Sequence, residues 1–477
     1  MSLGQKAIKS TIFVALTSYA GEGVNFIVSI ILARLLLPEH FGIIALAMFF
    51  LELFGRVREF GFDQALIHRQ TDPIKARATH FLLQVGTSLF SVILTLAFGP
   101  LLLRFYAPEV VQVLIIFSLF YLLKAATATP RIVLEKDLRF ANSTSIDFFA
   151  LVFSSILAVG TALAGFGLWS LVVYQVANTV FAGIAFWRLR SWEFVLVIDR
   201  DEIIWFLKFG FFLWLGGLTT FILFKYNDFI AGTFLGTATL GFYSRAFTFA
   251  QRPTSSITSV VSRVALPTYA LLQHDREKLS LTFNFVLRNI VRFSAPLSLL
   301  LFLLADDFTN VLLGEKWLPM IPIFRLLLIY GFLRSVFDDA GAFLTAIGKP
   351  QLVSVYLGVQ ALIILITTPL LIRSFGINGA AISLDFVLLV GIILAYFFVS
   401  RFVNIDYAGI IWPSFLPAAV TWAFSLYFQK DLIMGGAGPT FLFRLLILIG
   451  VYALSALIVG GRQMKEDSAF LWQRWRT

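Results

Sequence analysis

The chain has 477 residues, of which 59% are apolar and only 13% are charged. Soluble domains carry about 25% charged residues. This composition, with a mean hydropathy of +0.88, therefore excludes an ordinary soluble enzyme, a disordered protein and a secreted disulfide scaffold. It also excludes an outer-membrane barrel, whose alternating strands would not sum to such a high hydropathy. The sequence has no cysteine, which excludes thiol chemistry and zinc–thiolate sites. The composition predicts an all-α polytopic membrane protein.

The apolar residues fall into fourteen stretches, each close to the roughly 20 residues that a membrane-spanning helix needs. Each stretch is predicted to be a helix, because lipid leaves no other way to satisfy the backbone of a lone segment. The first stretch is predicted to be an uncleaved helix and not a signal peptide, because it is too long and contains Glu22. The predicted spans cover residues 11–33, 41–62, 80–104, 110–130, 146–164, 168–187, 208–231, 238–258, 285–305, 320–345, 352–373, 377–399, 409–428 and 440–460.

Lysine and arginine are distributed unequally between the two sides of these spans. Of 37 such residues, 22 lie in the termini and loops of one side, 5 lie on the other side, and the rest lie within spans. The positive-inside rule then predicts that both termini are cytoplasmic. The same asymmetry accounts for most of the net charge of +10 without nucleic acid as a partner. Longer basic loops are predicted at 63–79, 131–145, 188–207 and 259–284, none of them large enough for a soluble catalytic domain.

The sequence contains a weak internal repeat. Residues 31–42 resemble residues 229–241, and the Phe-Gly turn of residues 166–168 recurs at 375–377. The two offsets are similar, and the matches occur in the same order. Predicted spans 1–6 and 7–12 therefore look like two copies of one unit, with spans 13 and 14 added.

The repeat predicts three segments: an N-terminal six-helix lobe (1–200), a C-terminal six-helix lobe (201–403), and the last two spans with a tail (404–477). Six is an even number, so both lobes would enter the membrane from the same side. A parallel repeat of this kind is typical of a carrier with a central cavity between its halves and alternating access.

Charged residues within the predicted spans are candidates for function, because a charge at the bilayer centre costs about 2.5–3.5 kcal/mol on insertion scales. Glu52 with Arg56, and Asp228 and Asp338 with cations three or four residues before them, have the spacing of helical ion pairs. Other cations have no acid at that spacing, and such cations could bind an anionic head group. Internal ion pairing is the alternative for every member of the set. The predicted cationic cavity comprises Lys124, Lys225, Arg245, Arg288, Arg292, Arg325 and Arg334.

Four acids within the spans are predicted to be buried: Glu22, Asp338, Asp339 and Asp385. A carboxylate in a cavity of low dielectric constant can carry a coupling proton or help to bind Na⁺. Salt bridging to the cations is again the alternative.

Several catalytic and cofactor motifs are absent from the sequence. It has no phosphate-binding loop for ATP and no cluster of metal ligands, so neither a metal nor a cofactor is expected. The four histidines, His40, His68, His80 and His274, are predicted to be solvated because they lie in or beside loops. We therefore expect a protein that is not an enzyme, with H⁺ or Na⁺ coupling left open.

Several short motifs resemble a known family. They are Arg34–Gly42, Phe60-Gly61-Phe62, Leu134–Phe140, Leu240–Ala246 and Val264–Pro267. Their order and spacing resemble the Wzx-type oligosaccharide flippases of the polysaccharide transporter family, in the MOP superfamily, close to the colanic-acid-exporter-like branch. The resemblance covers nearly the whole chain.

The resemblance implies two six-helix lobes around a cationic central cavity, plus two further helices. It implies that the protein flips undecaprenyl-diphosphate-linked oligosaccharide from the cytoplasmic to the periplasmic leaflet of a bacterial inner membrane. A polysaccharide polymerase is a candidate partner. Three alternatives stay open: a multidrug exporter of the same superfamily, a membrane glycosyl polymerase or ligase, and a lipid II flippase. Within the predicted spans, cations without an acid three or four residues away outnumber acids without a cation at that spacing. This excess of positive charge argues against the drug exporter.

Overall fold

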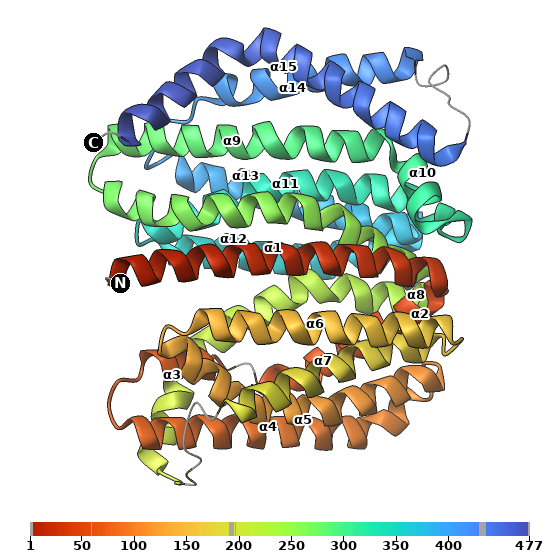
Figure 1. Cartoon of the computed structure of the whole chain (residues 1–477), viewed down its shortest axis with the longest axis vertical. Coiled ribbons are helices and arrows are strands. Elements are labelled where there is room, and N and C mark those ends of the chain that lie inside the picture. Colours follow the sequence, from red (N-terminus) through yellow and green to blue (C-terminus); the bar gives the residue numbers. More distant parts are fainter. Residues whose placement is uncertain (1–2, 59, 190–194, 196, 429–435, 476–477) are drawn as a thin grey trace. The chain divides into compact units, whose positions relative to one another are not determined.

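The computed structural model describes residues 3–58, 60–189, 195, 197–428 and 436–475 (Figure 1). Within these ranges the chain consists of helices and short connections, and no strand occurs. The predicted all-α architecture is confirmed. Eleven described helices are long and apolar enough to cross a membrane, or twelve if one bent pair counts as a single span. The chain is therefore a multi-pass membrane protein.

The number of spans is close to the predicted fourteen, and two features explain the difference. Helix α2 (Pro38–Phe54) has only 17 residues. Predicted spans 208–231 and 238–258 both belong to α8 (Arg200–Leu272), which has 73 residues. A straight helix of that length would measure about 110 Å, far more than the ~30 Å of a hydrocarbon core. Helix α8 is interrupted at Gly236, whose φ of 82° is readily adopted only by glycine.

The chain divides into two compact units, Met1–Gly241 and Phe242–Thr477. The first unit contains the N-terminal part of α8 and the following elements: α1 (Leu3–Leu35), α2, η1 (Gly55–Arg58), α3 (Phe62–His68), α4 (Pro73–Leu102), α5 (Pro108–Lys136), α6 (Phe140–Leu163) and α7 (Leu168–Arg188). Helix α5 packs against both α4 and α7, and α6 packs against α1 and α7 (Figure 1). This arrangement places α5 at the centre of the helices that form the site described below.

The second unit contains the rest of α8 and the following elements: α9 (Arg276–Leu303), α10 (Ala305–Phe308), η2 (Thr309–Leu313), η3 (Glu315–Met320), α11 (Ile321–Ala346), α12 (Pro350–Phe375), α13 (Ile377–Val399), α14 (Tyr407–Phe428) and α15 (Ala437–Trp475). Helix α13 packs against α11 and α12, and α14 packs against α9 and α15. The predicted division into segments 1–200, 201–403 and 404–477 stays a prediction.

Several segments predicted as long basic loops are helical. Helix α5 ends at Lys136 and α6 begins at Phe140, so the predicted loop 131–145 is a short turn. Helix α8 runs on to Leu272, and the Asp275 side chain caps α9 by accepting the backbone N–H of Lys278 at 3.0 Å. The helices continue past their apolar stretches because a helical backbone satisfies its own hydrogen bonds in any solvent. Residues 190–194 and 196 of the predicted loop 188–207 lie outside the described residues.

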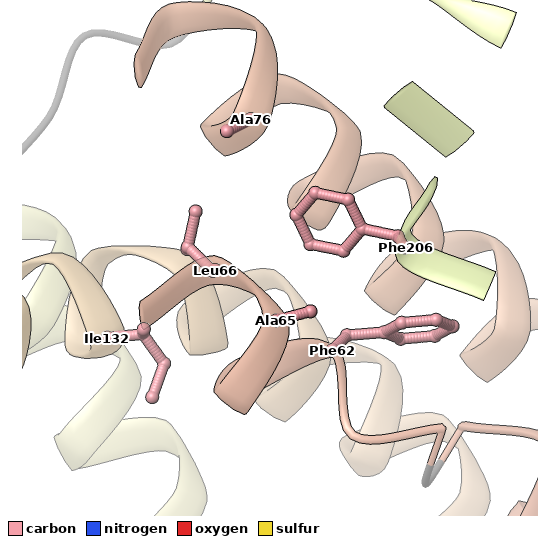
Figure 2. Close-up of a cluster of buried hydrophobic side chains, with 6 residues drawn as sticks. All are labelled: Phe62, Ala65, Leu66, Ala76, Ile132 and Phe206. Carbon is pink, nitrogen blue, oxygen red and sulfur yellow. The ribbon is translucent and has the colours of Figure 1, made fainter. Parts of the chain in front are cut away.

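The short helix α3 is held in place by a buried cluster (Figure 2). A seven-residue helix is not stable alone, so its position depends on these contacts. The cluster joins α3 to α4, α5 and α8 through Phe62, Ala65, Leu66, Ala76, Ile132 and Phe206, none more than 6% exposed. The ammonium group of Lys136 adds a polar clamp by donating to the carbonyl oxygens of Leu66, at 2.9 Å, and of Arg69. Asp63, the second residue of α3, is thereby fixed against α4 and α5.

Candidate functional site

Two cavities in the first unit both have residues of α5 in their walls. The α7 cavity has a volume of about 450 Å³ and is lined by residues of α2, α3, α5, α6 and α7. The α4 cavity has a volume of about 430 Å³ and is lined by residues of η1, α3, α4, α5 and α8. Asp63, Lys124 and Ala128 line both. Since ligand pockets are commonly about 300–1,000 Å³, each cavity can hold a small chemical group, and a ligand could reach both at Lys124.

Two cations of the α4 cavity converge on one aromatic ring, that of Tyr121, which itself lines the α7 cavity. The guanidinium carbon of Arg58 lies 4.3 Å from the centroid of the Tyr121 ring, and Nζ of Lys124 lies 5.0 Å from it. Lys124 is exposed and forms no ion pair with any residue that the structure describes. The ring stabilises both cations through its quadrupole, and the ammonium group of Lys124 keeps its N–H donors available. The formal charges of the residues that line the α4 cavity add up to +1, from the cations Arg58 and Lys124 and the carboxylate Asp63.

The α7 cavity has a different charge balance. Nε of Arg131 donates to Glu135 Oε1 at 3.1 Å, and Nη2 donates to Asp147 Oδ2 at 2.9 Å. With Lys124 and Asp63 included, the lining carries two cations and three carboxylates, a formal charge of −1. Helix α7 also lines this cavity and presents uncharged polar side chains, among them Gln175, Asn178 and Thr179. The two cavities therefore share Lys124 but suit different chemical groups.

Asp63 is held at the junction of the cavities by a buried histidine. Nε2 of His80 lies 3.0 Å from Asp63 Oδ1, and Nδ1 lies 2.8 Å from Thr129 Oγ1. The amide of Gln84 donates to the same Asp63 oxygen at 2.8 Å. Desolvation acts to raise the pKa of Asp63, but the hydrogen bonds from His80 and Gln84, together with nearby positive charge, outweigh it and lower this pKa below its usual value. Asp63 is thus a stable anion beside Lys124.

The position of His80 corrects the sequence-based expectation. His80 was expected to be solvated, but its side chain is fully buried, because α4 begins at Pro73 and carries the residue about two turns into the helix. Neither Asp63 nor His80 was among the predicted functional residues. A signal was present, since His80 and Gln84 are polar, lie four residues apart on one helix face, and occur in an otherwise apolar segment.

Three of the predicted cations form ion pairs. Arg334 pairs with Asp338 at 2.8 Å, as the spacing predicted. Lys225 of α8 pairs with Glu52 of α2, with 2.9 Å between Nζ and Oε1, so this ion pair joins two different helices. Arg325 has no acid three or four residues away, and it pairs instead with Asp306 of α10, whose Oδ2 lies 2.5 Å from its Nη2.

Besides Lys124, three predicted cations remain, and all three lie in the second unit. Arg245 lies on α8, and Arg288 and Arg292 lie one turn apart on α9. Nη1 of Arg292 donates to Asn289 Oδ1 at 3.3 Å. The role of these three residues in binding an anion stays a prediction.

The four predicted acids occupy different environments. The expectation that Glu22 is buried was wrong, because its side chain lies on an exposed face of α1. Asp339 is fully buried and accepts a hydrogen bond from the Tyr269 hydroxyl at 3.1 Å. Asp338 is paired with Arg334, and Oδ1 of Asp385 is buried without a hydrogen-bond partner among the described residues. The part of the chain that the structure describes holds no group of three or more acids or histidines suited to a metal ion.

Residues 31–322, more than half of the chain, match the family described as polysaccharide biosynthesis protein. The chain belongs to this family. It is 26% identical to an uncharacterized membrane protein in the cps region of Klebsiella pneumoniae, over 98% of both chains. It is 26% identical to the succinoglycan biosynthesis transport protein ExoT of Rhizobium meliloti, over 64% of this chain and 62% of the relative. It is 23% identical to the lipopolysaccharide biosynthesis protein WzxC of Escherichia coli, over 72% of this chain and 71% of the relative.

Solved structures show the same fold. The lipid II flippase MurJ, in an inward closed conformation, superimposes with a TM-score of 0.76 at 14% identity, over 95% of this chain and all of that chain. An inward-facing multidrug transporter of the MATE family, in the MOP superfamily, superimposes with a TM-score of 0.59 at 15% identity, over 80% of this chain and 94% of that chain. The predicted MOP-type fold and the resemblance to polysaccharide transport proteins are confirmed.

Proposed function

We propose that this chain is a flippase that moves a polyprenyl-diphosphate-linked oligosaccharide from one membrane leaflet to the other, for the synthesis of a surface polysaccharide. The observation that carries the proposal is the pair of cations at Tyr121, Arg58 and Lys124, on the wall of a polar cavity among helices of a membrane protein. Membership of the polysaccharide biosynthesis protein family and the names of the relatives support it.

The physical requirement for such a protein is clear. A sugar diphosphate cannot cross about 30 Å of hydrocarbon, because each polar group that enters lipid without a partner costs several kcal/mol. The polyprenyl tail can remain in lipid throughout. The protein therefore has to supply a polar path and fixed positive charge for the head group. Charge-assisted N–H donors of arginine and lysine are suited to phosphate oxygens, and Arg58 and Lys124 provide them on one wall.

The finer assignments are also part of this proposal. The carrier lipid would be undecaprenyl diphosphate, moved from the cytoplasmic to the periplasmic leaflet of a bacterial inner membrane, with both termini cytoplasmic. Transport would occur by alternating access without a catalytic step, and a polysaccharide polymerase would receive the product. Arg245, Arg288 and Arg292 would add positive charge along the path. Coupling to H⁺ or Na⁺ would use the carboxylates of Glu22, Asp338, Asp339 and Asp385.

A multidrug exporter is the second candidate, and one observation favours it: the formal charge of −1 in the α7 cavity suits an organic cation. Leaflet exchange in vesicles separates the two candidates. The purified chain is reconstituted into liposomes with a fluorescent polyprenyl-diphosphate oligosaccharide, and exchange is followed by quenching of the outer leaflet. We expect exchange above that of empty liposomes. Transport of a fluorescent drug cation without exchange of the lipid, under either a proton or a sodium gradient, would replace the flippase with the exporter.

A further inference from the structure

We infer that the α7 cavity binds the sugar residue next to the diphosphate, while the diphosphate binds at Arg58 and Lys124 in the α4 cavity. This inference rests on the proposed function and assigns two parts of one substrate to two adjoining cavities. Lys124 lines both cavities and lies where the phosphate–sugar bond would pass.

Charge excludes the diphosphate from the α7 cavity. Arg131 already binds one oxygen of Glu135 and one oxygen of Asp147, so two carboxylates share its single positive charge. A diphosphate placed there would face both carboxylates, and like charges repel. In the α4 cavity the same group would face two cations and only one acid. The anionic part of the substrate therefore belongs on the α4 side of Lys124.

Hydrogen-bonding groups in the α7 cavity suit sugar hydroxyls. Gln175, Asn178 and Thr179 have the i, i+3, i+4 spacing that places side chains on one face of a helix. The side-chain amides of Gln175 and Asn178 form no hydrogen bond with the described residues, so donors and acceptors are available on the same wall. In the same cavity, Glu135 Oε2 and Asp147 Oδ1 are not used in the pairs with Arg131 and can accept from hydroxyls. A hydroxyl both donates and accepts, so a sugar can satisfy all of these groups.

Aromatic rings complete the match. Phe117, Phe120, Tyr121 and Phe186 also line the α7 cavity and offer flat apolar surfaces to the C–H face of a sugar ring. The cavity volume of about 450 Å³ is many times the ~30 Å³ that one water occupies in the liquid. An inorganic ion would need none of the rings, and a drug cation would leave the amides unsatisfied. The combination of carboxylates, amides and rings is suited to a carbohydrate.

The absence of cysteine from the chain allows a direct test. Asn178→Cys places a single thiol in the α7 cavity, and Gln64→Cys, lining only the α4 cavity, is its matched partner. Lys278→Cys, at an exposed site on α9, controls for general changes in reactivity. Each variant, in lipid nanodiscs, is labelled with a maleimide in the presence of two probes. One is the polyprenyl-diphosphate-linked oligosaccharide isolated from the cells that make this protein, and the other is undecaprenyl diphosphate without sugar.

We expect the glycolipid, at about ten times its Kd, to slow labelling of both Asn178→Cys and Gln64→Cys about tenfold, as site occupancy requires. Undecaprenyl diphosphate should slow only Gln64→Cys. Equal protection of Asn178→Cys by the sugar-free lipid would overturn the inference, and so would glycolipid protection of Gln64→Cys alone. In either case the wild-type chain would still exchange the lipid, so the proposed function would stand. Ala182→Cys lines the same cavity and replaces Asn178→Cys if that variant does not fold.

Discussion

Gly42 and Gly241, the glycines of the two repeat motifs, face each other in the first unit. A Cβ atom added to Gly42 would overlap the carbonyl oxygen of Thr237 and lie 3.0 Å from the backbone nitrogen of Gly241. A Cβ atom added to Gly241 would overlap the carbonyl oxygen of Pro38 and lie 3.2 Å from the backbone nitrogen of Gly42. The repeated glycine therefore serves a reciprocal backbone contact between α2 and α8.

The first prediction concerns this contact. Gly42→Ala or Gly241→Ala should destabilise the protein by about 3 kcal/mol or more, because the added methyl group meets backbone atoms that cannot rotate away. Thermal unfolding in detergent measures the loss. Gly23→Ala is the matched control, since no atom lies within 4 Å of its added Cβ, and alanine should be neutral or slightly stabilising in that helix. Equal melting temperatures for Gly42→Ala and Gly23→Ala would show that the contact does not hold α2 to α8.

The second prediction concerns the pH dependence of Asp63. Its pKa is lower in the folded protein than its usual value, so ionised Asp63 stabilises the fold above about pH 4. This contribution is lost as the pH falls through the lowered folded-state pKa. Asp63→Asn should cost about 1–3 kcal/mol at pH 7 and should weaken the loss of stability on acidification. Melting temperatures between pH 3 and pH 7 test this. The same pH profile for Asp63→Asn and the wild type would contradict it, and Asp201→Asn, an exposed acid on α8, serves as control.

A third prediction addresses the ion pair of Lys225 and Glu52 between α8 and α2. Both side chains are only partly exposed, so Glu52→Gln alone should leave a poorly solvated ammonium group and destabilise the protein by up to about 3 kcal/mol. The double variant Glu52→Gln with Lys225→Met removes both charges and should recover most of that loss. A double-mutant cycle on melting free energies isolates the coupling. Strictly additive effects would mean that the two residues do not interact.

Lys124 supports a fourth prediction. Lys124→Ala should weaken binding of the lipid diphosphate about tenfold to a hundredfold, because one charge-assisted hydrogen bond contributes about 1.5–3 kcal/mol. Lys124→Arg should keep most of the affinity. Binding of undecaprenyl diphosphate to the protein in nanodiscs provides the measurement, with Lys278→Ala as the control for a lost surface charge. An unchanged Kd for Lys124→Ala would remove this residue from the anion site.

The class of fold and the family signature could be predicted from the sequence because both depend on local patterns. Apolar stretches set the helices, and each family motif, such as Arg34–Gly42, is contained within a few consecutive residues. The Gly42–Gly241 contact explains why glycine occurs in both repeat motifs. The sequence pattern alone does not show this contact.

The partners of the charged residues were predicted less well than the class of fold. Ion pairs were predicted only from acids three or four residues away in the sequence. Arg325 finds its acid on α10 and Lys225 on α2, at separations that no helical spacing shows. Asp63 and His80 come together only because the Phe62 cluster docks α3 on α4. Glu22 was expected to be buried, but α1 leaves its side chain on an open face. Tertiary packing decided each of these positions.

The most direct test of the central claim is the rate of leaflet exchange in liposomes for the wild type and for the double variant Arg58→Ala with Lys124→Ala. The probe is a fluorescent polyprenyl-diphosphate oligosaccharide, and Lys278→Ala is the matched control. The account predicts exchange by the wild type and by Lys278→Ala, and a rate close to that of empty liposomes for the double variant in a protein that remains folded. Exchange by the double variant at the wild-type rate would contradict the assignment of the anion site to the cations at Tyr121.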